Sequence, residues 1–157
     1  MRSANPGETE DQRIRRILER ARSIAVVGAS PDPRRPSHRV MAFLHAAGYR
    51  LIPVNPQSLG NVLFGEPCVA SLESIASPVD LVDVFRASAA VPEIVESAIR
   101  IGAPALWLQI GVRHEAAAAR AAAAGLDVIM DRCPAIEMPR LGIAGPRPAI
   151  IEPPRAP

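Results

Sequence analysis

The sequence contains no lysine, and all 18 of its basic residues are arginine. A chain without lysine cannot form the Schiff base on which pyridoxal-phosphate enzymes depend. It also cannot supply the lysine that holds the phosphates in a P-loop NTPase. The missing residue type therefore excludes both classes of protein.

Cysteines, aromatic residues and long apolar runs are scarce as well. Two cysteines, Cys68 and Cys133, are too few for a disulfide scaffold and match no zinc spacing, so we predict no metal site. Aromatic residues make up 3% of the chain and hydrophobic residues 48%, which predicts an aliphatic, alanine-rich core. No apolar run reaches the roughly 18 residues that cross a bilayer.

The start of the chain, "MRSANPGETEDQRIRR", is polar and charged, unlike a secretory signal. We therefore expect a cytoplasmic protein that does not engage a membrane. The net charge of +2 is too small to favour a nucleic-acid partner. A protein partner stays open, because the amphipathic stretch "RIRRILERARSI" could cover a sheet or meet another chain.

The length of 157 residues suggests one domain, in which a pattern of helix, glycine and apolar strand occurs three times. In each case the glycine, which is Gly48, Gly102 or Gly125, stands where a left-handed helix end is expected. Such alternation predicts an α/β, Rossmann-like, doubly wound fold. We expect a mainly parallel sheet of five to six strands, with helices on both faces.

The predicted elements follow from this pattern. Strands are expected at Ile24–Gly28, Arg50–Val54, Leu81–Phe85, Ala105–Ile110 and Asp127–Met130, with a weaker one near Val62–Leu63. Helices are expected at Glu10–Arg22, Pro36–Ala47, Ala89–Ile101 and Glu115–Ala124, with turns at Leu72–Ile75 and Pro134–Leu141 and with Ser88 as an N-cap. We expect residues 1–9 to be flexible, 10–143 to form the domain and 144–157 to be a disordered, proline-rich tail.

The segment "GASPDPRRPS" follows the first strand and precedes a helix, where a doubly wound sheet binds its ligand. The helix start offers unpaired N–H groups to an anion. Ser30 and Ser37 add hydroxyl groups, and Arg34 and Arg35 can form forked hydrogen bonds to phosphate oxygens. The segment therefore predicts a phosphate-binding turn.

An NAD site is disfavoured on two counts. Its glycine motif is reduced to Gly28, and the second strand ends in Asn55 and Pro56 where an acidic residue should hold the ribose. The arginines could accommodate the additional phosphate of NADP, although they lie in the first loop. The ligand is expected to carry more phosphate than NAD.

Five segments form an ordered set along the chain: "VVGAS", "PSHRVMAFLHAAGYRLIPVNP", "PVDLVDVFR", "WLQIGV" and "MDRCPAIEMPRL". Together they resemble a known family, the small single-domain CoA-binding proteins, which are similar to the N-terminal domain of the succinyl-CoA synthetase alpha subunit. The resemblance runs from about Ile24 to Leu141. The residue before the cysteine is Arg132, which departs from the synthetase pattern.

The resemblance implies coenzyme A as ligand, lying across the carboxyl ends of the strands. It places the nucleotide and pyrophosphate at the first turn and the pantetheine arm along the later strand ends. The positions that match the family's binding residues are Gly28, Ala29, Ser30, Arg35, Ser37, Val54, Asn55, Pro56, Phe85, Arg86, Gln109, Gly111 and Cys133.

No catalytic residue is predicted. The histidines His38, His45 and His114 have no carboxylate at a useful spacing, and His114 fits a helix-capping position. Asp80 and Asp83 are expected to be solvated or structural. Cys133 is either a packing residue or a thiol near the ligand, whose pKa the helix start would lower if N–H groups point at the sulfur.

Three functions stay open at this point. The first is a CoA or acyl-CoA binding module without turnover, which would act as a carrier, sensor or regulator. The second is an enzyme, either NADP-dependent or handling the CoA thiol through Cys133. The third is an interaction domain with a vestigial pocket.

Overall fold

The computed structural model describes residues 5–146 and contains a five-stranded parallel sheet with the order β2-β1-β5-β6-β7. Its strands are β1 (Ser23–Val27), β2 (Arg50–Val54), β5 (Leu81–Val84), β6 (Ala105–Leu108) and β7 (Asp127–Ile129). All neighbouring pairs are parallel. The predicted α/β, Rossmann-like class is confirmed.

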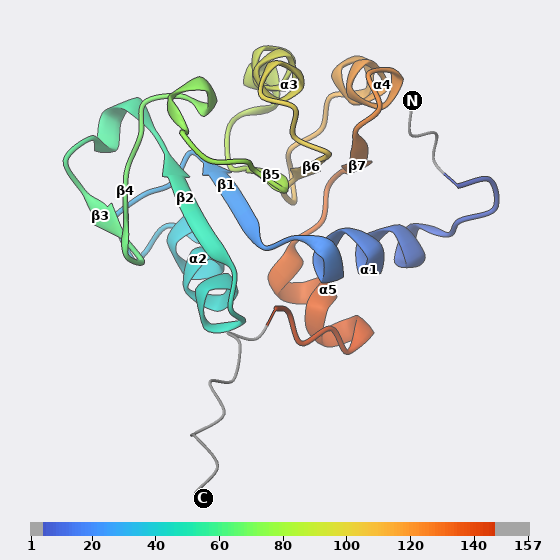
Figure 1. Cartoon of the computed structure of the whole chain (residues 1–157), viewed down its shortest axis with the longest axis horizontal. Coiled ribbons are helices and arrows are strands. Elements are labelled where there is room, and N and C mark those ends of the chain that lie inside the picture. The colour runs from blue at the N-terminus through green and yellow to red at the C-terminus, as the bar shows by residue number, and fades with distance from the viewer. Residues whose placement is uncertain (1–4, 147–157) are drawn as a thin grey trace, which may run out of the picture.

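Helices cover both faces of the sheet (Figure 1). One face carries α1 (Glu10–Arg20), α2 (Pro36–Ala46) and α5 (Pro134–Leu141), and the other carries α3 (Val91–Arg100) and α4 (Glu115–Ala123). Four of these helices begin at the predicted residue, and α3 begins two residues later than predicted. Thr9 and Gln12 form a capping box at α1, and proline occupies the first turn of α2, α3 and α5.

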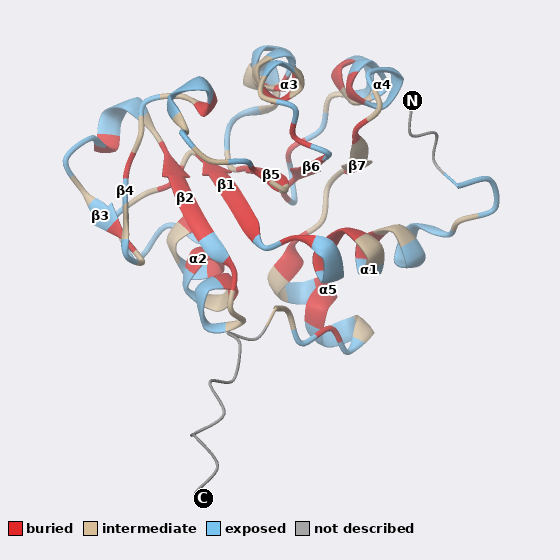
Figure 2. Ribbon diagram, viewed as in Figure 1, coloured by how far each residue is buried: buried red, intermediate tan, exposed pale blue. Residues whose placement is uncertain are grey.

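The core is divided by the sheet into two apolar clusters, and every residue of the three central strands β1, β5 and β6 is buried (Figure 2). One cluster holds Trp107 and Tyr49, the largest fully buried side chains, with α1, α2 and α5 around them. The other consists mainly of Val, Ile, Leu and Ala under α3 and α4. Both clusters agree with the predicted aliphatic core.

Most differences from the predicted elements are one or two residues at an end, but two change the description. Val62–Leu63 does form a strand, β3, yet it pairs with β4 (Glu66–Pro67) in a separate antiparallel hairpin and does not extend the main sheet. Ser88 is not the N-cap of α3, which is Ala90. Instead Ser88 opens a 3₁₀ turn, and its hydroxyl accepts a hydrogen bond from the Arg113 amide.

The three glycines predicted to end helices all have positive φ, at 103° for Gly48, 74° for Gly102 and 96° for Gly125. The expected proline-rich tail lies mostly outside the described residues, as do residues 1–4 of the expected flexible start. Within the described range, none of the helices combines the length and apolarity that crossing a bilayer requires.

The sheet reverses its strand order between β1 and β5, and the chain leaves these two strands toward opposite faces. Gly28 lies at this point with a φ of 88°, and its amide donates to the Val54 carbonyl. A Cβ atom at Gly28 would stand 2.3 Å from the Phe85 carbonyl oxygen. The close approach of the two strand ends therefore depends on glycine.

Candidate functional site

A cavity of about 950 Å³ opens at the carboxyl ends of β1, β2, β5 and β6, where doubly wound sheets bind ligands. Its wall is completed by the starts of α2 and α5. The lining residues are Gly28, Ser30, Arg35, Pro36, Ser37, Val40, Asn55, Pro56, Gln57, Ser58, Phe85, Arg86, Gln109, Ile110, Val112, Cys133 and Ile136.

The loop between β1 and α2 is held in a defined turn. The Ser30 hydroxyl accepts a hydrogen bond from the Asp32 amide, and His38 Nδ1 lies 3.0 Å from the Ser30 carbonyl oxygen. No side chain caps the first turn of α2, and the Ser37 amide has no backbone acceptor among residues 5–146. The start of this helix therefore presents a free N–H group to the cavity.

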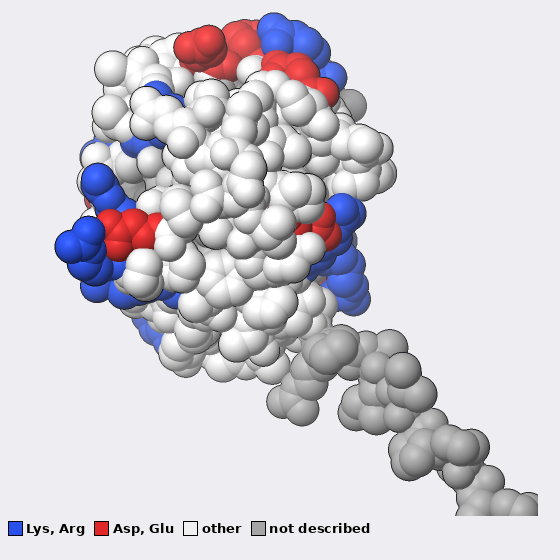
Figure 3. All heavy atoms as spheres, turned by 90° about the vertical axis from the view of Figure 1, so that its left-hand side faces the viewer, with Lys and Arg blue, Asp and Glu red and all other residues white. Residues whose placement is uncertain are grey.

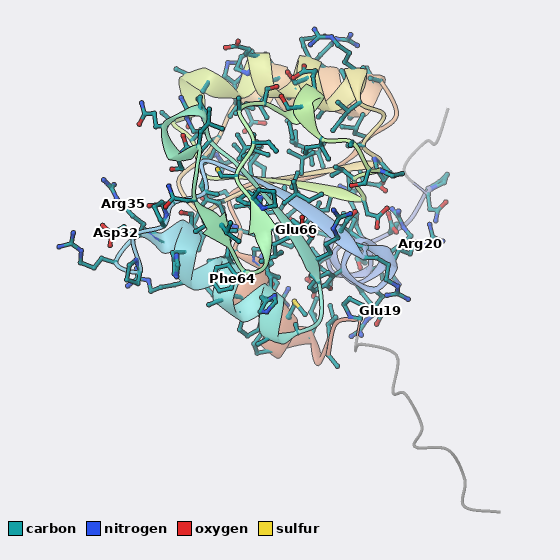
Figure 4. All side chains as sticks on the ribbon, turned by 60° about the vertical axis from the view of Figure 1, so that its left-hand side comes forward. Glu19, Arg20, Asp32, Arg35, Phe64 and Glu66 are labelled. Carbon is teal, nitrogen blue, oxygen red and sulfur yellow. The ribbon has the colours of Figure 1, made fainter. Side chains whose placement is uncertain are left out.

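The two adjacent arginines of this loop are placed differently. Arg34 forms a forked ion pair with Asp32, at 3.1 Å, and its side chain is 88% exposed. Arg34 lowers the pKa of the Asp32 carboxyl through these hydrogen bonds. Arg35 lines the cavity and makes no side-chain hydrogen bond or ion pair within residues 5–146. Figure 4 shows Arg35 and Asp32 projecting from this loop.

Arg86, directly after Phe85 at the end of β5, is the second cavity arginine without an acidic partner in the described part of the chain. Most described arginines pair with carboxylates, as Arg16 does with Glu8 and Asp127. The side of the molecule that carries the β3–β4 hairpin is largely uncharged, with charged side chains grouped at its edges (Figure 3). The cavity thus holds two guanidinium groups available to an anion.

Asn55, at the end of β2, uses its side-chain amide in hydrogen bonds to the protein backbone. Its Nδ2 donates to the Ala29 carbonyl at 2.9 Å, and its Oδ1 accepts from the Gln57 amide at 3.0 Å. These bonds tie the end of β2 to the first turn. Asn55 therefore contributes to the cavity mainly by shaping it.

Cys133 lines the cavity and is buried at the N-cap of α5. The amides of Ala135 and Ile136 point at the sulfur and favour the thiolate, but burial outweighs them and raises the pKa of the thiol. The nearby carboxyl groups of Asp83 and Glu137 act in the same direction as burial. The helix start lowers the pKa as expected for N–H groups that point at the sulfur, but desolvation, which the sequence did not show, outweighs this effect.

Asp83 lies in the middle of β5 and is completely buried. Its Oδ1 accepts a hydrogen bond from Gln109 Nε2 at 2.9 Å, and its Oδ2 has no partner among the described residues. Burial raises the pKa of this carboxyl to about 7, while the Gln109 hydrogen bond opposes the rise. Asp80, by contrast, accepts from the Arg22 and Ser23 amides and holds the start of β1.

The structure brings most of the predicted site residues to one cavity and leaves four outside its lining. The four are Ala29 and Val54, which are buried in the core, Arg34, which pairs with Asp32, and Gly111, which is exposed. The residues that the sequence analysis missed are Pro36, Val40, Gln57, Ser58, Ile110, Val112 and Ile136. The sequence indicated these residues only through their neighbours, because each lies within a few positions of a residue that was predicted.

The histidines have structural partners. His114 caps α4, because its Nδ1 accepts from the Ala117 amide at 3.0 Å, as the sequence predicted. His38 and His45 both contact the Phe64 ring, with ring centroids 5.1 and 5.4 Å apart. Among residues 5–146, no cluster of His, Cys, Asp or Glu side chains is arranged to hold a metal ion.

Comparison with known proteins identifies the family. A model of the CoA binding domain matches residues 22–139, which is most of the chain. The chain belongs to this family. The CoA-binding-domain protein is also 42% identical over 129 residues to YneT of Bacillus subtilis (strain 168), an uncharacterized protein, covering 82% of this chain and 92% of YneT.

Solved structures share the fold of this chain. A Thermus thermophilus protein, cell-free ID.343, is 42% identical with a TM-score of 0.81, and the match covers 85% of this chain and 99% of that one. A dinucleotide-forming acetyl-coenzyme A synthetase of Ca. Korarchaeum cryptofilum shares the fold at 22% identity and a TM-score of 0.65. That match covers 75% of this CoA-binding-domain protein and 27% of the synthetase.

Proposed function

We propose that this CoA-binding-domain protein holds CoA or acyl-CoA in the cavity at the strand ends. It acts there as a carrier, sensor or regulatory module without turnover of its own. The phosphates lie against the start of α2 and Arg35, and the pantetheine arm follows the ends of β5 and β6. The observation that carries the proposal is that Arg35 and Arg86, which have no acidic partner among residues 5–146, share one cavity with a helix start that no side chain in that range caps.

The chemistry of CoA fits this arrangement. CoA carries a pyrophosphate and a 3′-phosphate, and guanidinium groups bind phosphate oxygens through charge-assisted hydrogen bonds. The remaining wall is largely apolar, with Val40, Ile110, Val112 and Ile136, which suits a long, uncharged arm. An acidic clamp for a ribose, which an NAD site needs, is missing from the end of β2.

The test is calorimetric titration of the full chain with CoA, dephospho-CoA and NADP at moderate salt. CoA should bind best, and dephospho-CoA should bind more weakly because it lacks the 3′-phosphate. Arg35→Ala should weaken CoA binding by about 1.5–3 kcal/mol, the contribution of a charge-assisted hydrogen bond. Arg34→Ala is the matched control, because it removes the same charge from an arginine that pairs outside the cavity. Tighter binding of NADP than of CoA would contradict the proposal.

A second candidate function is CoA-thiol handling by Cys133, which one observation favours: its buried sulfur lines the same cavity. Thiol–disulfide exchange with the disulfide of CoA would join the Cys133 sulfur to one CoA sulfur and release the other CoA as a thiol. Incubation with CoA disulfide at pH 8, followed by mass spectrometry, tests this function. An adduct on Cys133 supports it, and its absence eliminates it.

A further inference from the structure

The buried side chains of Asp83 and Gln109 form a hydrogen-bonded pair at the wall of the cavity. Asp83 pairs with Trp107 of β6, and Gln109 follows Trp107 by two residues, so all three side chains point to the same face of the sheet. This is the face covered by α2 and α5, where Trp107 is part of the core. Gln109 is 6% exposed and lines the cavity, whereas Asp83 is fully buried behind it. The only polar contact between them is the hydrogen bond from Gln109 Nε2 to Asp83 Oδ1.

This contact decides which end of the Gln109 amide faces the ligand. An ionised carboxylate only accepts hydrogen bonds, so it must be met by the nitrogen of the amide. The oxygen, Oε1, is then the atom left for the cavity. Within residues 5–146 the side-chain amide of Gln109 makes no other hydrogen bond, so its oxygen, Oε1, is free to accept one.

We propose that Asp83 is a positioning residue, which holds Gln109 Oε1 toward the cavity to accept a hydrogen bond from an amide N–H of the pantetheine arm. The inference rests on the proposed function, because it names the part of CoA that this wall recognises. The pantetheine arm has two amide N–H groups, and an N–H is a much stronger donor than a thiol. A phosphate oxygen, which only accepts, would be repelled at the same place.

The orientation of the amide depends on the charge of Asp83. A protonated carboxyl can donate to an amide oxygen, so protonation lets Gln109 turn and present its NH₂ group to the cavity. The titratable groups near Asp83 are Cys133, the N-cap of α5, and Glu137 within that helix. The charged groups that line the cavity together with Gln109 are Arg35 and Arg86. Glu137 is held by Arg132 and Arg140, and His38 contacts the Ser30 carbonyl and the Phe64 ring.

The test compares CoA with adenosine 3′-phosphate 5′-diphosphate, which is CoA without its pantetheine arm, by titration calorimetry of the full chain. Asp83→Asn keeps the size of the side chain but supplies an amide donor that can bind Gln109 Oε1. We expect this variant to lose about 3- to 10-fold in CoA affinity, the value of one hydrogen bond, and to bind the truncated ligand as the wild type does.

Two further measurements exclude a merely structural effect. Gln109→Met should cause a similar loss for CoA, and adding Asp83→Asn to it should change nothing more, because the two residues act as one unit. In the wild type, the ratio of CoA affinity to truncated-ligand affinity should fall as the pH drops below about 7, the pKa of Asp83. The 3′-phosphate titrates in both ligands, but the terminal phosphate of the truncated ligand has a further ionisation, with a pKa of about 6, that CoA lacks. The same ratio is therefore measured for Gln109→Met, and only the fall beyond that of this variant is assigned to Asp83.

Equal binding of CoA by Asp83→Asn and the wild type would overturn the inference. An equal loss for both ligands would also overturn it, because the effect would then lie in the shape of the cavity. If Asp83→Asn does not fold, the pH dependence of the wild-type ratio and the Gln109→Met variant still decide the question. If the wild type binds neither ligand, the proposed function itself fails, which is a different result from an unchanged ratio.

Discussion

Replacing Gly28 with alanine tests the geometry on which the cavity depends. Gly28 has a φ of 88°, and adopting a left-handed backbone costs a residue with a Cβ about 1–2 kcal/mol. The new Cβ would also lie 2.3 Å from the Phe85 carbonyl oxygen and 3.2 Å from Arg86 Cδ. Relieving such overpacking costs about 1–3 kcal/mol. Together these effects predict a loss of about 2–5 kcal/mol in the free energy of unfolding.

The assay is equilibrium unfolding in urea, with Gly65→Ala as the matched control. Gly65 has a φ of 84°, but a Cβ there would have no atom within 4 Å, so this variant carries the backbone cost alone. The difference between the variants therefore measures the contact between the ends of β1 and β5. We expect Gly28→Ala also to weaken CoA binding, and Gly65→Ala to leave it unchanged. Equal destabilisation by the two variants would refute the reasoning.

Four other predictions follow from single contacts or shifted pKa values. Tyr49→Phe should cost about 1–3 kcal/mol in urea unfolding, because the buried hydroxyl donates to the Leu18 carbonyl, and unchanged stability would contradict that role. His114→Ala should cost about 0.5–2 kcal/mol by removing the cap of α4, whereas His45→Ala, on an exposed helix face, should cost little. Cys133 should react with iodoacetamide at pH 7.5 more slowly than free cysteine, because burial raises the pKa of its thiol, and reaction as fast as that of free cysteine would count against this. The Asp83 carboxyl has a higher pKa in the folded state, about 7, than its ordinary value of 3.8, so it stabilises the fold at low pH and this stability is lost as the pH rises toward and through 7. Between pH 4 and pH 8 this loss in the free energy of unfolding should be at least about 1.4 kcal/mol, the value of one pKa unit. Asp83→Asn should abolish it in unfolding curves measured over that range.

The sheet and its helices were predictable because the signals are local and repeated. Each unit of helix, glycine and apolar strand carries its own pattern, so Gly48, Gly102 and Gly125 mark the boundaries correctly. Of the hairpin of β3 and β4, only the strand β3 was predicted from the sequence. Its two-residue strands are too short to show alternation, and Phe64 in its turn has a φ of 51°, which is uncommon for an aromatic residue.

The site was predictable in outline, because the carboxyl ends of parallel strands meet at one edge of a sheet. Its details depend on contacts between distant residues. Nothing in "PRRP" indicates that Arg34 turns to Asp32 while Arg35 remains free. The burial that raises the pKa of Cys133 comes from packing, and the pairing of Asp83 with Gln109 joins residues 26 positions apart. Such features need the assembled fold.

The most direct test of the central claim is a crystal structure of the full chain grown with millimolar CoA. The account predicts CoA in the cavity at the strand ends, with a phosphate oxygen within hydrogen-bond distance of the Arg35 guanidinium and of the Ser37 amide. It also predicts that the pantetheine arm passes Gln109. An empty cavity in a correctly folded protein, or CoA bound at another surface, would contradict it.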